Sequence, residues 1–205
     1  VLGLVLVGDV DRFHLPIGRE KCDSFVDKRR KFTDRAVALP QRNFRVAWLA
    51  EEIGKEMQLS EHHVEGMSLA AMLHDIGIFL TAAPTIGCTG SQPYIRHGIL
   101  GREILEQCGM ARHALVCERH VGVGLTAADI RQYNLPLPER DMLPVTLEEQ
   151  IVCYADKFYS KNGSDRATGK NIAAVLNSLE PYGPEKVKRF KAWIDRFEDQ
   201  THHEP

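Results

Sequence analysis

Five residues with side chains that ligate metals recur along the middle of the chain in similar settings. Each has small or apolar neighbours, as in the segments LHDIG, IRHGILG, CERHVGVG and CYADKF. Neutral imidazole and carboxylate together suit borderline or hard divalent metals such as Fe, Mn, Zn or Mg. A water held by one or two such ions ionises near neutral pH and can then attack phosphorus. The pattern therefore predicts metal-assisted hydrolysis at His74, Asp75, His97, His120 and Asp156.

The alternative for any single histidine is an ordinary core or surface side chain, which is the usual role of a lone histidine in a helix. His14 is undecided between the two roles. The set of five differs because an Asp follows a His in an apolar segment and the setting then repeats. We therefore interpret the set as a metal site. Polar surroundings favour the ordinary role for the remaining histidines, which are His62, His63, His113, His202 and His203.

The stretch from Arg42 to Lys161 resembles the HD-domain metal-dependent phosphohydrolases. The segments that carry the resemblance stand in the family's order: VAWLAEEIGKEMQLSEHHVEG, LAAMLHDIG, HGILGREIL, ERHVGVGL and LEEQIVCYADKFYSK. The resemblance implies an all-α helical bundle and a centre of one or two divalent metal ions. It also implies hydrolysis of a phosphate ester, with a nucleotide or another small phosphorylated metabolite as the substrate.

Arg42 departs from the family's pattern. The family's first ligand is a His four residues before a Val-Ala pair, and that position is Arg42 here. Arginine stays protonated and offers no lone pair to a metal. In dinuclear members the first His, the doublet and the final Asp hold one ion, whereas the doublet's Asp and the two later histidines hold the other. On that mapping the site of Asp75, His97 and His120 is intact, and the other site has lost a ligand.

Three outcomes stay open at this position. The protein is a mononuclear enzyme, a dinuclear one in which His14 or water replaces the ligand, or a metal- and nucleotide-binding module without catalysis. Arg42 itself is a candidate catalytic residue that holds a substrate phosphate through paired hydrogen bonds. The alternative is a solvated arginine on the first turn of a helix.

Other cations beside the ligands are candidates for contact with the substrate. We expect Asp75 to bridge the metal ions and Lys157 to assist catalysis, and we expect Arg96 and Lys161 to bind the substrate. Arg119 is a weaker candidate. For each of these cations a plain surface charge is the alternative.

Narrower groups of the family fit less well. The run from Val46 to Gly66 is similar to the HD-GYP cyclic-dinucleotide phosphodiesterases, but their Lys after HDIG is Ile78 here and their Gly-Tyr-Pro signature is absent. The acidic pair of the stringent-response hydrolases is absent as well. The group that remains is the small, stand-alone HD phosphohydrolases.

The composition is that of a compact protein that works inside the cell. The chain has 205 residues, 43% of them hydrophobic, and a net charge of −2, which provides no general basic field for nucleic acid. Five cysteines without a framework predict a reduced, cytoplasmic setting, with Cys88 a buried or inert thiol. The opening VLGLVLV is too short for a membrane helix and lacks the basic leader of a signal peptide. We therefore expect no nucleic-acid partner and no membrane association.

Helical intervals are clear from Val46 onward, with Ser60 placed to cap a second helix that ends near Gly77. Residues 80–95 are rich in Pro, Gly, Ser and Thr, and we expect a loop that walls or covers the site. His97 should open the next helix.

The starts of the later helices are also indicated by residues that lie close together in the sequence. Thr126 and Asp129 flank a short helix, and Thr146 begins a capping box for a helix that is apolar almost all round. Asp156 in that helix should be buried, and a buried carboxylate needs a partner such as a metal. Pro184 should begin a last helix with an apolar stripe of Val187, Phe190, Ile194 and Phe197, which docks on the core or joins two copies in a homo-oligomer.

These patterns divide the chain into three parts. Residues 1–40 are an N-terminal extension of unassigned structure, in which VLGLVLV reads as a short buried strand. Residues 41–162 are the HD-type core, and residues 163–205 are a C-terminal helical extension that packs on it.

Overall fold

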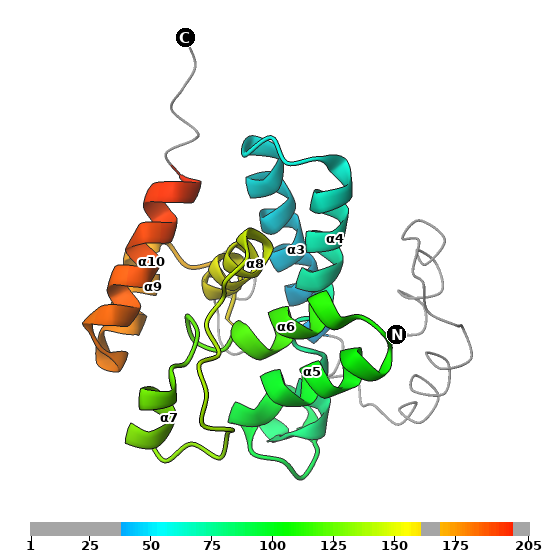
Figure 1. The fold of residues 1–205 in the computed structure, drawn as a ribbon, viewed down its shortest axis with the longest axis vertical. Coiled ribbons are helices and arrows are strands. Elements are labelled where there is room, and N and C mark those ends of the chain that lie inside the picture. The colour runs from blue at the N-terminus through cyan, green and yellow to red at the C-terminus, as the bar shows by residue number, and fades with distance from the viewer. Residues whose placement is uncertain (1–37, 161–168, 199–205) are drawn as a thin grey trace.

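The computed structural model describes residues 38–160 and 169–198, which form a bundle of helices with one short strand pair (Figure 1). The all-α fold class predicted from the sequence is therefore confirmed. Residues 1–37, which include VLGLVLV and His14, lie outside the described residues, as do Lys161 and the two last histidines. In chain order the α-helices are α3 (Ala38–Glu56), α4 (Glu61–Leu73), α5 (His97–Gln107), α6 (Ala111–Arg119), α7 (Ala127–Gln132), α8 (Leu147–Phe158), α9 (Ile172–Leu179) and α10 (Pro184–Phe197).

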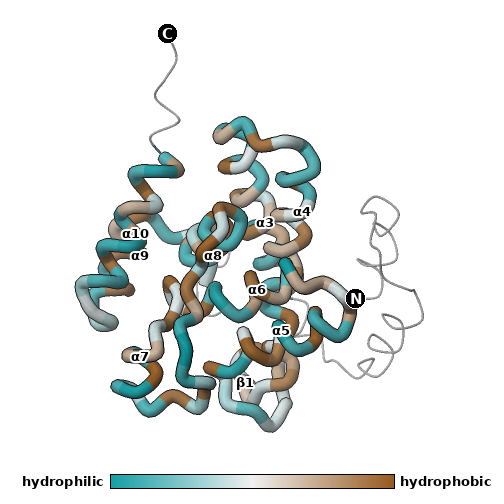
Figure 2. The backbone as a smooth tube through the Cα atoms, viewed as in Figure 1, coloured by the Kyte–Doolittle hydropathy of each residue, from teal (hydrophilic) through white to brown (hydrophobic). Residues whose placement is uncertain are grey.

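Helix α8 lies in the middle of the bundle, with α3 and α4 on one side and α9 and α10 on the other (Figure 1). Its residues from Ile151 to Asp156 are all buried, as expected for a helix that is apolar on nearly every face. The outer helices α3 and α10 alternate between hydrophilic and hydrophobic residues along their length (Figure 2). Their apolar faces therefore pack inward against α8.

Capping residues begin several of these helices where the sequence predicts. The Thr126 and Asp129 side chains form a capping box at α7, and Thr146 and Glu149 form another at α8. Ser60 is the N-cap residue of α4, although its side chain makes no capping hydrogen bond. Helix α3 begins at Ala38, just before the predicted start of the core.

Gly77 lies where the chain after α4 crosses the start of α5. The chain there forms the short 3-10 helix η2 (Ile76–Leu80). A Cβ atom on Gly77 would overlap the carbonyl oxygen of His97 and the amide of Gly101. Glycine is therefore required because two backbones touch at this point. The contact fixes His74 and Asp75, which precede Gly77, against the helix that begins with His97.

The predicted loop over residues 80–95 contains short regular pieces. They are β1 (Ala82–Ala83), η3 (Pro84–Ile86), β2 (Cys88–Thr89) and η4 (Tyr94–Arg96), with β1 and β2 antiparallel. Cys88 is fully buried, as predicted. At the end of the segment the Tyr94 ring lies 4.9 Å from the His97 ring between centroids. This part of the segment therefore borders the predicted site.

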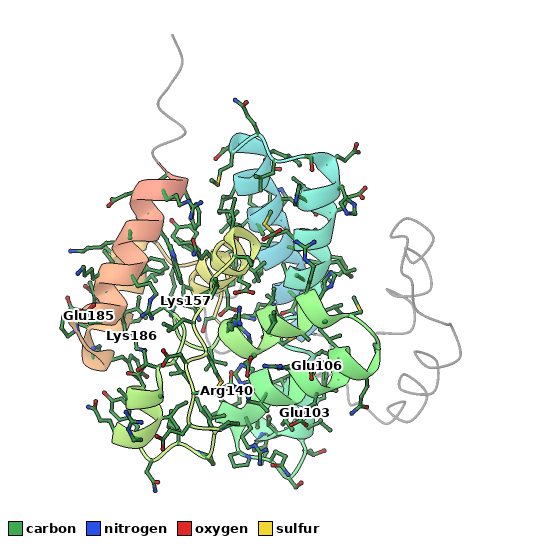
Figure 3. All side chains as sticks on the ribbon, in the orientation of Figure 1. Glu103, Glu106, Arg140, Lys157, Glu185 and Lys186 are labelled. Atoms are coloured by element: carbon green, nitrogen blue, oxygen red, sulfur yellow. The ribbon has the colours of Figure 1, made fainter. Side chains whose placement is uncertain are left out.

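The C-terminal helices α9 and α10 pack on α8, joined by η6 (Glu180–Tyr182). The Tyr154 and Phe190 rings stack with centroids 5.0 Å apart. The predicted stripe packs on the core, with Phe190 and Phe197 buried and Val187 and Ile194 half-buried against it, and Trp193 is an additional buried residue of this helix. Lys186 on α10 pairs with Asp129 on α7 and also donates to the Gly124 carbonyl at 2.8 Å (Figure 3).

None of the helices in the described ranges combines the length and the hydropathy that crossing a membrane requires.

Candidate metal centre

The five predicted ligands lie together in the interior. His74 and Asp75 follow α4, His97 begins α5, His120 follows α6, and Asp156 lies in the last turns of α8. Each is at most 5% exposed to solvent. A buried group of imidazoles and carboxylates is costly unless its members neutralise one another or hold a cation. The five residues therefore form one buried polar site inside an apolar bundle.

All three histidines are oriented in the same way. The Nδ1 atom of each faces the backbone carbonyl three residues earlier: His74 faces Ala71 at 2.5 Å, and His97 and His120 face Tyr94 and Cys117 at 2.8 Å. A carbonyl oxygen only accepts hydrogen bonds, so Nδ1 carries the proton. In the neutral ring the lone pair is then on Nε2, which faces the centre.

One half of the centre surrounds Oδ1 of Asp75. The Nε2 atoms of His97 and His120 lie 3.5 and 3.4 Å from this oxygen and 3.1 Å from each other. Ligand atoms about 2.1 Å from a common ion and roughly 100° apart lie about 3.2 Å from one another. The three atoms therefore have the spacing and the lone pairs that a single divalent ion needs, and their residues fit a metal.

The other half surrounds Oδ2 of Asp75 and contains Arg42. The Nη1 atom of Arg42 donates to Oδ2 at 2.8 Å and lies 3.3 Å from Nε2 of His74, while Nη2 pairs with the Asp156 carboxylate. Nε donates to the carbonyl of Tyr159 at 2.9 Å. His74 Nε2 lies 3.1 Å from Oδ1 of Asp156. The guanidinium is thus the cation for both carboxylates.

A wider grouping of ligand atoms spans the two halves. His74, Asp75 and His120 each offer one atom, and these atoms all lie within 4.8 Å of one another. The His74 and His120 rings meet edge to face with centroids 4.8 Å apart. His97 approaches this group through Asp75 and His120 rather than through His74.

The two halves of the centre also differ in the direction in which the pKa values of their histidines are shifted. Burial alone would raise the pKa of Asp156, but the charges of Arg42 and Lys157 outweigh it and hold that pKa well below its usual value. Burial would lower the pKa of His74, yet the carboxylates of Asp75 and Asp156 outweigh burial and raise it. At His120 burial prevails and lowers the pKa. The ring of His120 is therefore neutral near neutral pH and keeps its Nε2 lone pair.

The other predicted cations differ in whether they contact a residue of the centre. Lys157 donates to Oδ2 of Asp156 at 2.7 Å, and its side chain is 16% exposed (Figure 3). Arg96 donates to Gln92, while its buried Nε atom has no hydrogen-bond partner among the described residues. Arg119 is engaged elsewhere, with both oxygens of Glu149 at 2.9 Å.

Three further residues at the centre were missed by the sequence reasoning. The Tyr94 side chain is 40% exposed and its ring contacts His97, so it lies between the buried centre and the surface. Asn43 and the Tyr159 carbonyl accept from Arg42. The only available signal was position, because Tyr94 stands three residues before a ligand and Asn43 directly follows Arg42. His62 and His63 are exposed, as predicted, and His113 is half-buried.

The comparisons with known proteins agree with this geometry. The family model of the HD domain matches residues 42–160. A protein of Methanocaldococcus jannaschii described as uncharacterized is 40% identical over 48% of this chain and 51% of its own length. The tRNA (cytidine(56)-2'-O)-methyltransferases of Picrophilus torridus and Thermoplasma volcanium are 35% and 30% identical over 52% and 64% of this chain.

The matches cover only part of each relative. The chain spans about half the length of the first protein, and 30% and 34% of the two methyltransferases. No solved structure matches the chain.

Proposed function

This chain belongs to the HD-domain family, and we propose that it hydrolyses a phosphate ester with the help of a bound divalent metal ion. The substrate we propose is a nucleotide or another small phosphorylated metabolite. The observation that carries the proposal is the pair of Nε2 atoms of His97 and His120, 3.1 Å apart beside Oδ1 of Asp75. Two lone pairs at this distance repel each other, and a divalent ion bound by all three atoms removes the repulsion.

A divalent ion held there would lower the pKa of a water and polarise a phosphoryl oxygen. Fe, Mn, Zn and Mg all suit this mixed donor set. Among the ion pairs of the described residues, Asp75 and Asp156 bring two negative charges, and Arg42 and Lys157 bring two positive ones. The charge of the ion is therefore not cancelled by the site and attracts an anionic phosphate group.

Lys157 is the cation best placed to meet that phosphate. Its ammonium group is held by Asp156 at 2.7 Å and is partly exposed, whereas Arg42 is only 7% exposed. Asp156 has a pKa held well below its usual value, so we assign it the orientation of Lys157 and Arg42 rather than the uptake of a proton. Arg96 and Lys161 remain proposed contacts for the rest of the substrate.

The test is hydrolysis by protein that has been stripped with a chelator and then supplied with Mn²⁺ or Fe²⁺. The panel contains an aryl phosphate, 5'- and 3'-nucleotides and, because two relatives are named as tRNA methyltransferases, nucleoside 2',3'-cyclic phosphates. We expect turnover that needs the metal and is lost in the Asp75→Asn variant, which controls for contaminating phosphatases. Turnover that persists in that variant would contradict the proposal.

A second candidate is a module that binds metal and nucleotide without turnover. It is favoured by one observation, the engagement of Arg42 with both carboxylates of the centre. Binding of a nucleotide in equilibrium dialysis, with no turnover of any panel member under any metal, would favour the module over the enzyme.

A further inference from the structure

The Asp75 carboxylate divides the centre into two sets of atoms. Oδ1 faces His97 and His120 at 3.5 and 3.4 Å. Oδ2 faces Arg42 at 2.8 Å and His74 at 3.3 Å. The first set consists of three atoms that can ligate a metal, and the second set already contains a positive charge.

Arg42 is fixed in the second set from three directions. Nε is held by the Tyr159 carbonyl, Nη1 by Asp75, and Nη2 by the carboxylate of Asp156. Asn43, which accepts from Nη1, is itself held to the carbonyl of Met72 at 3.1 Å. A planar guanidinium with partners on all three nitrogens has little freedom to turn away.

A metal ion in the second set would therefore meet two obstacles. It would lie beside a fixed positive charge, and like charges repel most strongly where water is excluded. It would also compete for Oδ2 of Asp75 and for the Asp156 carboxylate, which already accept hydrogen bonds from Arg42. At Oδ1, His97 and His120, by contrast, the three atoms already have the spacing of ligands about one ion.

We propose that Arg42 is a resident cation that takes the place of a second metal ion, so that the centre binds one divalent ion through Asp75 Oδ1, His97 and His120. His74 and Asp156 then hold Arg42 and orient Asp75 rather than ligate an ion. The inference rests on the proposed function only in requiring that the centre binds metal. It applies equally to an enzyme and to a binding module.

The first test counts ions in the unmodified chain. The protein is stripped with a chelator, loaded with excess Mn²⁺ and examined by native mass spectrometry and elemental analysis. We expect one ion per chain. Two fully occupied ions would overturn the inference and leave the proposed function standing, whereas no bound ion would overturn the proposed function itself.

The second test restores a histidine at position 42. We expect Arg42→His to bind two Mn²⁺ ions, with the exchange-coupled electron paramagnetic resonance signal of a bridged pair. Arg112→His is the matched control, because it replaces an arginine whose side chain is 77% exposed on α6, and it should still bind one ion. A folded Arg42→His protein that binds one ion with no coupled signal would contradict the inference.

A third measurement decides which atoms hold the ion, even if Arg42→His does not fold. His97→Ala should weaken Mn²⁺ binding more than about 100-fold, because it removes a direct ligand, whereas an outer-shell partner contributes about 10- to 100-fold. His74→Ala should keep one ion per chain with the smaller loss. The reverse order, with the ion lost in His74→Ala and kept in His97→Ala, would place the ion in the half of Arg42 and refute the assignment.

Discussion

Two buried cations, Arg42 on α3 and Lys186 on α10, can be compared because their surroundings are alike in several respects. Each residue is 7% exposed, is paired with an aspartate and donates to a backbone carbonyl. Lys186 meets Asp129, whose carboxylate also closes the capping box of α7. Arg42 meets two carboxylates that border three imidazole rings.

The difference lies in what else the carboxylates contact. The Asp129 carboxylate accepts hydrogen bonds from the N-cap residue of α7 and from the Lys186 ammonium group. These contacts explain its position through the stability of the fold alone. Asp75 turns one oxygen to Arg42 and the other to His97 and His120, whose Nε2 atoms have the spacing of ligands about one ion. A buried ion pair alone is therefore weak evidence of function, and ligand atoms at metal-binding distances beside it are stronger evidence.

The largest effect we expect comes from removing Arg42. In Arg42→Met the buried carboxylates of Asp75 and Asp156 lose the guanidinium, although Asp156 keeps Lys157, and breaking a buried ion pair costs about 3–5 kcal/mol of unfolding free energy. Added Mn²⁺ should restore much of this loss, because a metal ion can then neutralise the same carboxylates. The measurement is chemical denaturation with and without Mn²⁺. A variant that Mn²⁺ does not stabilise more than it stabilises the unmodified protein would contradict this expectation.

A smaller effect should follow from Gly77→Ala, which disturbs the histidine half of the centre but not the contacts of Arg42. The added methyl group collides with the start of α5, so we expect a loss of about 1–3 kcal/mol and displacement of His97. Mn²⁺ affinity should fall while the contacts of Arg42 persist. Gly66→Ala is the control, since its Cβ atom meets nothing within 4 Å. Unchanged metal affinity in Gly77→Ala would show that His97 does not depend on this contact.

Lys186→Met should destabilise the protein by about 1–3 kcal/mol, because it leaves the partly buried Asp129 with fewer hydrogen-bond partners. Unlike the loss in Arg42→Met, this loss should be the same in chelator and in excess Mn²⁺, and the ion count should not change. Thermal unfolding of the stripped and loaded proteins checks both points. If Mn²⁺ restored the stability of Lys186→Met, the proposed difference between Lys186 and Arg42 would be wrong.

The smallest effect is a dependence on pH. Burial would raise the pKa of Asp129, but hydrogen bonds from Lys186 and Thr126 outweigh burial and lower it. A depressed carboxyl pKa contributes stability that is present above the unfolded value of about 3.9 and is lost as the pH falls through the folded value. The stability difference between the unmodified protein and Lys186→Met should therefore shrink as the pH falls below about 4. A difference that stays constant between pH 6 and pH 3 would count against the role of this pair.

The parts of the fold that the sequence could predict are those set by local signals. The capping boxes at Thr126 and Thr146 and the N-cap at Ser60 depend on residues three or four positions apart, so they can be read from the chain. The burial of Asp156 followed from the apolar residues around it. Trp193 was missed because the tertiary packing of α10, rather than its period alone, decides which side chains are buried.

The site was predictable only as a set of residues and not as a geometry. The residue pattern indicated the ligand set and the family resemblance added the departure at Arg42, and the structure brings these residues together. Apart from the adjacent Asn43, the partners of Arg42 lie 32 to 117 residues away along the chain, so no local pattern announces them. The metal-binding and catalytic roles of these residues stay predictions.

The contacts that place the ligands lie largely outside the ligand set. Glu149 caps α8, which carries Asp156, and also holds Arg119, the residue before His120, while Gly77 sets α4 against α5. A replaced ligand therefore leaves this frame intact. Some arginine codons differ from histidine codons by one nucleotide, so on our assignment a single point mutation at position 42 would change the number of metal ions.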